Sequence, residues 1–98
     1  FGTFAWLVVH ITESRVFFVK SFGSNSAVHQ RFQAALRDLW REELDDLGLN
    51  YTEHTLIFAL GGVFAVLFEW ARAKTLEPNH QVLQRVNELA ASVLPAAS

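Results

Sequence analysis

The side chains with the widest chemical scope in this sequence are its four histidines. His10, His29, His54 and His80 fall on or beside four different expected helices, and no two of them stand four residues apart. A helix binds zinc through histidines at i and i+4, because that spacing puts two imidazoles on one face. We therefore expect no metal site within a single helix, which leaves open a site assembled in three dimensions.

The sequence also lacks the common catalytic motifs. It has no glycine-rich phosphate loop, no HExxH, no GxSxG and no pair of close carboxylates on an apolar face. It contains no cysteine, which excludes disulfides and thiolate chemistry; this fits a reducing compartment and is also compatible with secretion. We expect a cytoplasmic protein that is not an enzyme and carries neither a cofactor nor a metal.

The overall composition is rich in apolar residues for a single small domain of residues 1–98. Hydrophobic residues make up 51% of the chain and aromatic residues 13%, which is more apolar surface than one small bundle readily hides. The excess predicts a homo-oligomeric interface or an internal apolar cavity, and the two are compatible. A net charge of −2 with a pI near 6.1 argues against direct binding to nucleic acid or to an anionic membrane.

If a cavity exists, its walls are apolar and suit a hydrophobic or aromatic small molecule. His10 is the histidine of most interest because Val8, Val9 and Ile11 flank it, although such a histidine is more often a wall residue than a ligand or a base. The alternative for the aromatic residues is that they belong to the hydrophobic core, which is the commoner case. The expected ligand-binding residues are Trp6, His10, Phe17, Phe32, Leu36, Trp40 and Phe58.

The stretch from Leu56 to Phe68 is an apolar run interrupted by Gly61 and Gly62 alone. Its length of roughly 13 residues is short of the about 20 that a membrane span needs, so a buried core helix is the first interpretation and a membrane helix the minor one. Glycine inside a helix costs about 1 kcal/mol relative to alanine. The pair therefore predicts close approach of another helix, which would compensate.

Two faces of this helix differ in side-chain size. The face with mostly small side chains contains Ala59, Gly62, Val66, Glu69 and Ala73. The face with bulkier side chains contains Ile57, Leu60, Phe64, Leu67 and Ala71. We expect the bulky face to pack against the chain's own core and the small face to meet a second copy of the chain. Trp70 then adjoins this contact or, alternatively, closes the end of the core.

Two helices are expected in the first half of the chain. Residues from about Thr3 to Phe22 carry two apolar stripes and one wet face, which indicates a helix buried on two sides. Their β-branched and aromatic residues leave strands as the second interpretation. Ser24 or Ser26 then caps an amphipathic helix from Ala27 to Leu47.

Two more helices are expected in the second half. Gly48 has the position of a left-handed helix stop, and Asn50, or alternatively Thr52, caps the next helix after a loop of about three residues. So short a loop makes the flanking helices antiparallel neighbours. Pro78 suits the first position of a last helix, which closes at Pro95.

The boundaries of these last helices follow from polar residues and from the chain end. We expect the glycine-containing helix to end within Lys74–Glu77 and the tail Ala96–Ser98 to be frayed. The predicted fold class is therefore all-α, an antiparallel bundle of about four main helices.

The order of features from residue 54 onward resembles a known family. His54 to Trp70 read H-x3-F-A-x-G-G-x3-V-L-x-x-W, and a helix opening at Pro78 follows. This pattern is similar to the C-terminal part of tetracycline-repressor-like (TetR family) transcriptional regulators. HITESRVFFVKSF, residues 10–22, resembles a helix early in that family's regulatory domain, and RFQAALRDLW, residues 31–40, resembles the helix before its interface pair.

The resemblance implies an all-helical regulatory domain whose last two helices form a four-helix interface with a second subunit, while the other helices surround an inducer pocket. The family's DNA-binding helix-turn-helix lies upstream of this region, so the resemblance implies that it precedes Phe1. The absence of methionine fits this, because it indicates that the sequence begins inside a longer protein. The expected interface residues are Ala59, Gly62, Val66, Glu69, Trp70, Leu83, Val86, Leu89 and Val93.

Two functions are therefore expected from the sequence. The first is the effector-binding and dimerisation domain of a TetR-like regulator, a homodimer that senses an apolar or aromatic small molecule and reaches DNA through the upstream domain alone. The second is a stand-alone helical dimerisation or adapter module without a ligand. Neither function involves a membrane.

Overall fold

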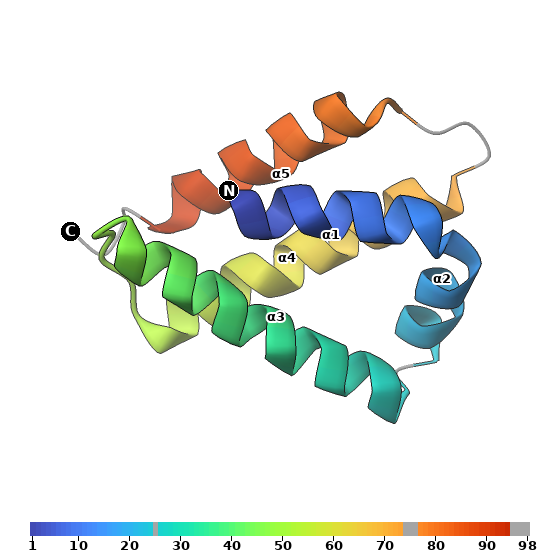
Figure 1. Ribbon diagram of the computed structural model, residues 1–98, viewed down its shortest axis with the longest axis horizontal. Coiled ribbons are helices and arrows are strands. Elements are labelled where there is room, and N and C mark those ends of the chain that lie inside the picture. The colour runs from blue at the N-terminus through green and yellow to red at the C-terminus, as the bar shows by residue number, and fades with distance from the viewer. Residues whose placement is uncertain (25, 74–76, 95–98) are drawn as a thin grey trace.

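The computed structural model describes residues 1–24, 26–73 and 77–94. Within these ranges it contains five α-helices and no strand (Figure 1). The helices are α1 (Gly2–Glu13), α2 (Arg15–Gly23), α3 (Ala27–Asp46), α4 (Glu53–Arg72) and α5 (Asn79–Val93). The all-α class is confirmed, and the strand interpretation of the first residues is wrong.

Two helices, α1 and α4, are central to the bundle, since each contacts the other four. In Figure 1, α1 crosses in front of α4, while α5 and α3 lie on opposite sides of this pair and do not contact each other. α3 and α4 run in opposite directions, as the loop between them predicts. The apolar run expected at the centre is thus central, but α1 shares that place.

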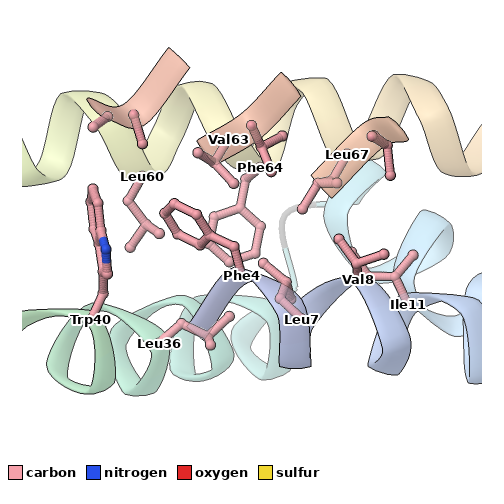
Figure 2. Packing of buried hydrophobic residues seen from close by; sticks show 14 of the residues in the cluster. Phe4, Leu7, Val8, Ile11, Leu36, Trp40, Leu60, Val63, Phe64 and Leu67 are labelled. Atoms are coloured by element: carbon pink, nitrogen blue, oxygen red, sulfur yellow. The ribbon is translucent and has the colours of Figure 1, made fainter. Parts of the chain in front are cut away.

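The hydrophobic core forms where α1 faces α4. Figure 2 shows Leu60, Phe64 and Leu67 of α4 pointing toward the side chains of α1. The fully or almost fully buried residues of α1 are Phe4, Leu7, Val8 and Ile11. Burying each such side chain contributes about 1.5–3 kcal/mol, so this contact is a main source of stability. The bulky face of α4 therefore packs on the chain's own core, as expected, except for the exposed Ile57.

The single helix expected over residues 3–22 is instead two helices that meet at Ser14. The backbone of Ser14 leaves the helical region, with φ −128° and ψ 40°. The change of direction lets Phe18 and Phe22 of α2 stack against Phe64 of α4, with ring centroids 6.5 and 6.3 Å away. Tertiary packing thus sets this break, because the sequence there has neither glycine nor proline.

The ends of α3 and the start of α4 follow local sequence signals. Ser26 Oγ accepts a hydrogen bond from the backbone N–H of His29 at 3.1 Å, so Ser26 is the cap of α3. Gly48 has φ +69° and its N–H bonds to the carbonyl of Asp45, so the left-handed stop is confirmed. Thr52 Oγ1 accepts from Thr55 N–H at 3.1 Å.

Two details of that connection correct the sequence prediction. The alternative cap, Thr52, is the cap of α4, so the capping box at Asn50 is wrong. The connection covers residues 47–52, which is longer than the loop of about three residues expected from glycine and asparagine alone. The extra length arises because residues 49–51, which belong to no helix, separate the helix stop at Gly48 from the threonine cap.

The junction of α4 and α5 also differs in detail from expectation. α4 ends at Arg72 with Ala73 as its C-cap, and Pro78 is the N-cap of α5 rather than its first residue. The expected helix end at residues 74–77 falls mostly on Lys74–Leu76, which lie outside the described residues, as do Pro95 and the tail Ala96–Ser98.

One helix among the described residues, α4, is long and apolar enough to cross a membrane, with 20 residues and a mean hydropathy of 1.6. Inside this bundle, 44% of its apolar window is buried. A core helix of a soluble protein passes the same test of length and composition. The hydropathy of α4 is therefore weak evidence, and the absence of a membrane partner stays a prediction.

Candidate functional site

Most of the expected interface residues share one surface of the molecule, formed by α4 and α5. This α4–α5 face contains two hollows that meet at Val66. The first is a groove of about 180 Å³ lined by Phe58, Ala59, Gly62, Val63, Val66, Leu89, Ala90, Ser92 and Val93. The second, of about 450 Å³, is lined by Ala65, Val66, Glu69, Trp70, Ala73, Glu77 and Arg85. All expected interface residues except Leu83 and Val86 line at least one of these two hollows.

Val86 is in a different place from the one expected. Its side chain is fully buried in the chain's own core, with Val82 and Ala90 on the same side of α5, and Leu83 is half-buried against that core. The apolar stripe of α5 therefore faces α4 and α1 rather than a second subunit. Leu89, which is 47% exposed, is the large apolar residue that α5 turns to the α4–α5 face.

The glycine pair divides between two surfaces. Gly62 lies in the α4–α5 groove, whereas Gly61 borders a separate hollow of about 140 Å³ between α3 and α4. A Cβ atom added to either glycine would meet nothing within 4 Å. Packing inside the chain therefore does not require either glycine, and the close helix contact that the sequence predicted does not occur within one copy.

Two ion pairs border the wider hollow. Arg85 binds both carboxylate oxygens of Glu77, at 2.9 and 2.8 Å, and these bonds hold the pKa of the Glu77 carboxyl below its usual value. Arg72 pairs with Glu69 at 3.1 Å. The indole N–H of Trp70 donates to the carbonyl of Glu77 at 3.0 Å, so this largely buried tryptophan fixes the residue that leads into α5.

The expected ligand-binding residues do not form one pocket. Leu36 and Trp40 are buried in the core, and Phe58 lies on the α4–α5 face, where it is 72% exposed. Helical periodicity shows which apolar residues share one face of a helix. It does not show which other helix packs against that face. Their assignment to a common pocket is therefore wrong.

The remaining expected ligand-binding residues lie together where α1, α2 and α3 meet. The rings of Trp6 and His10 stack at 5.1 Å with 9° between their planes, and the His10 and Phe32 centroids are 5.2 Å apart. Trp6 and Phe17 are 51% and 59% exposed. A cavity of about 60 Å³ beside this cluster is lined by His10, Phe17, Phe18, Ser21, Val28, His29 and Phe32.

His29 is a polar residue of this cavity that was not among the expected ligand-binding residues. It is 3% exposed, and its ring lies among Phe18, Phe22 and Phe64, with centroid distances of 6.2, 4.7 and 5.5 Å. Its Nε2 atom is buried with no hydrogen-bond partner. Burial lowers the pKa of His29, which favours the neutral imidazole. The spacing from Leu36, seven residues on, was the available signal that both face the core.

The other histidines do not form a cluster with His29. His54 and His80 are exposed at the starts of α4 and α5. Across the described ranges, no group of three histidine, aspartate or glutamate side chains is placed to hold a metal ion.

Comparison with known proteins identifies no relatives. No protein-family model matches the sequence, and neither a curated protein nor a solved structure matches the chain.

Proposed function

We propose that the chain forms a homodimer through the α4–α5 face and serves as the effector-binding and dimerisation domain of a TetR-like transcriptional regulator. The observation that carries the proposal is the groove at Gly62, which is open to solvent although apolar side chains surround it. Its rim includes the highly exposed Phe58 and the half-exposed Leu89. Apolar surface of this kind on a helix pair is typical of an interaction site.

A second copy of the chain is the partner that fits this face best. Helices normally pack with their axes 8–10 Å apart, depending on the side chains between them. Two α4 helices that cross at Gly62 can approach closely because no side chain stands between them there. In a symmetric dimer, Phe58 of each copy would cover the groove of the other, since the same face is used twice.

The effector would bind in a separate region, where α1, α2 and α3 meet. α1 and α4 touch, so a molecule bound beside α1 has a physical route to the α4–α5 face. A ligand that binds one dimer geometry better shifts the population toward it. That shift would change the spacing of two upstream DNA-binding domains.

The experiment that tests dimerisation combines mass and distance. Sedimentation equilibrium of the free chain should give twice the single-chain mass of 11.1 kDa. Because the sequence has no cysteine, one spin label can be placed at Ser92→Cys in the groove. Dipolar spectroscopy should then give a narrow distance distribution between the two copies. A matched label at Glu13→Cys, exposed at the end of α1, should give a longer distance.

A mass of 11.1 kDa at all concentrations would contradict the proposal. A dimer in which the Glu13 label gives the shorter distance would also contradict it, because another face would then form the contact.

A dimerisation or adapter module without a ligand is the second candidate function. The observation in its favour is the size of the cavity, about 60 Å³, whereas sites for small molecules usually measure roughly 300–1,000 Å³. A thermal-shift screen with apolar compounds distinguishes the two, since a bound ligand raises the melting temperature and an adapter does not respond.

A further inference from the structure

We propose that the cavity between α1, α2 and α3 and the aromatic surface beside it bind a small hydroxylated aromatic molecule, whose hydroxyl bonds to His29 Nε2. The inference rests on the proposed function, because it names the chemical class of the effector.

The Nε2 nitrogen of His29 is buried without a hydrogen-bond partner. Buried polar side chains almost always have a hydrogen-bond partner, and an exception needs an explanation. His29 lines the cavity, is 3% exposed, and has phenylalanine rings on several sides, none of which offers a conventional partner for Nε2. A polar guest in the cavity supplies the partner that the chain does not. Ser21, which is also buried in the lining, adds a second polar side chain.

The side chains of the cavity also restrict the charge and the polarity of the guest. The lining contains no carboxylate, lysine or arginine, so it offers no partner to a charged group. Burial lowers the pKa of His29, so at neutral pH the imidazole carries no charge that would attract an anion. In the neutral ring Nε2 either donates or accepts, depending on the tautomer. A hydroxyl group does both, so it satisfies His29 in either form.

An aromatic surface lies next to the cavity. His10 and Phe32 belong to the cavity lining and also to the stack with Trp6. About 60 Å³ is enough for a hydroxyl and the near edge of a ring. The rest of the molecule then lies against Trp6 and Phe17, which are half exposed, in the offset or edge-on arrangements that aromatic rings prefer.

The experiment compares 4-ethylphenol with ethylbenzene, which differ only in the hydroxyl, by titration calorimetry on the 98-residue chain. We expect the phenol to bind at least about tenfold more tightly, as one well-made buried hydrogen bond allows. In His29→Phe the preference should disappear while ethylbenzene binding remains. In the matched control His54→Phe, at the exposed start of α4, both affinities should stay unchanged.

A second measurement does not depend on the folding of a variant. With isotope-labelled histidine in the wild-type chain, the nitrogen resonances of His29 should shift when the phenol is added and stay in place with ethylbenzene. Equal binding of the two compounds, binding of neither, or a preference that survives in His29→Phe would overturn the inference. Unmoved His29 resonances would overturn it as well, because the hydroxyl would then not reach Nε2.

The failure of this inference and the failure of the proposed function look different. Light scattering on the same samples reports the dimer independently of the ligand. A monomer that still prefers the phenol keeps this site and contradicts the dimer. A dimer that does not distinguish the two compounds overturns this site alone.

Discussion

Arg15, the first residue of α2, donates from Nη2 to the backbone carbonyl of Ala73, the C-cap of α4, at 2.6 Å. Its Nε donates to the carbonyl of Ala71. The last carbonyls of a helix have no partner within the helix, and a cation there also interacts favourably with the helix dipole. One side chain therefore joins the break between α1 and α2 to the end of the central helix.

Replacing Arg15 by glutamine should lower the free energy of unfolding by about 1–3 kcal/mol, because two charge-assisted hydrogen bonds to helix-end carbonyls are lost. Urea unfolding at neutral pH measures the change. Arg31→Gln, at an exposed position of α3, is the matched control and should change stability by less than about 0.5 kcal/mol. Equal effects of the two substitutions would mean that the contact with Ala73 adds nothing.

The contact of Arg15 with α4 illustrates why some parts of the fold could be predicted from the sequence and others could not. The ends of α3 depend on neighbours in the chain, since Ser26 caps its own helix and Gly48 adopts φ +69° where a left-handed residue is required. Arg15, which directly follows the break at Ser14, instead bonds to the end of α4, 58 residues away. Periodicity within α1 and α2 carries no information about that partner.

The candidate sites divide in a similar way. Residues at helical spacing, such as Gly62 and Val66, were correctly placed on one face because spacing alone determines this. Which face turns inward depends on the other helices. Val86 was expected at the interface and is buried, and on α3 Val28 is exposed while the neighbouring His29 is buried. In the first turn of α3 the buried side chain is thus a histidine rather than the adjacent valine, and its ring faces Phe22 and Phe64 of other helices.

Glu43 caps α1 from a different helix, and its pH dependence can be tested. Its carboxylate accepts from the N–H groups of Gly2 and Thr3 at 2.5 and 3.1 Å. Burial alone would raise the pKa of Glu43, but the hydrogen bonds from Thr3 and Gly2 outweigh it and hold the pKa below 4.5. The stabilisation is therefore complete above the ordinary pKa and is lost as pH falls through the lowered one.

Glu43→Gln should accordingly reduce stability at pH near 7 by about 0.5–2 kcal/mol, the usual range for loss of a helix cap. The difference from wild type should shrink in acid, where Glu43 is protonated in both states. Urea unfolding at a series of pH values measures this, with the neighbouring exposed Glu42→Gln as control. A difference that stays constant down to strongly acidic pH would argue against the carboxylate as the cause.

Gly62→Leu should split the proposed dimer, because a bulky side chain in the α4–α5 groove would push two facing helices apart. Gly61→Leu is the matched control, since it makes the same change on the same helix but toward the α3–α4 hollow. Both glycines have open space at the Cβ position, and leucine is the better helix former, so both variants should fold. Light scattering should report a single-chain mass for Gly62→Leu and a doubled mass for Gly61→Leu. A doubled mass for Gly62→Leu would show that the groove is not the interface.

The burial of His29 predicts how stability depends on pH. Desolvation lowers the pKa of His29 from 6.5 in the folded chain, so below about pH 6.5 the unfolded chain binds a proton that the folded chain does not. The contribution of neutral His29 to the free energy of unfolding is therefore complete above about pH 6.5. It decreases as the pH falls toward the lowered pKa of the folded chain. His29→Phe removes the titrating group and keeps an aromatic ring among Phe18, Phe22 and Phe64.

As the pH falls from about 7.5 to 5.5, the free energy of unfolding of His29→Phe should therefore rise relative to that of the wild type. Urea unfolding at each pH measures this trend. His80→Phe, at an exposed position of α5, should run parallel to wild type over the same range. The direction of the trend is the decisive observation, because a folded state that bound the proton more readily than the unfolded one would give the opposite slope. Parallel curves for His29→Phe and wild type would mean that the imidazole reaches water in the folded chain. The cavity would then be open to solvent at Nε2, and a hydroxyl guest would have to compete with water there.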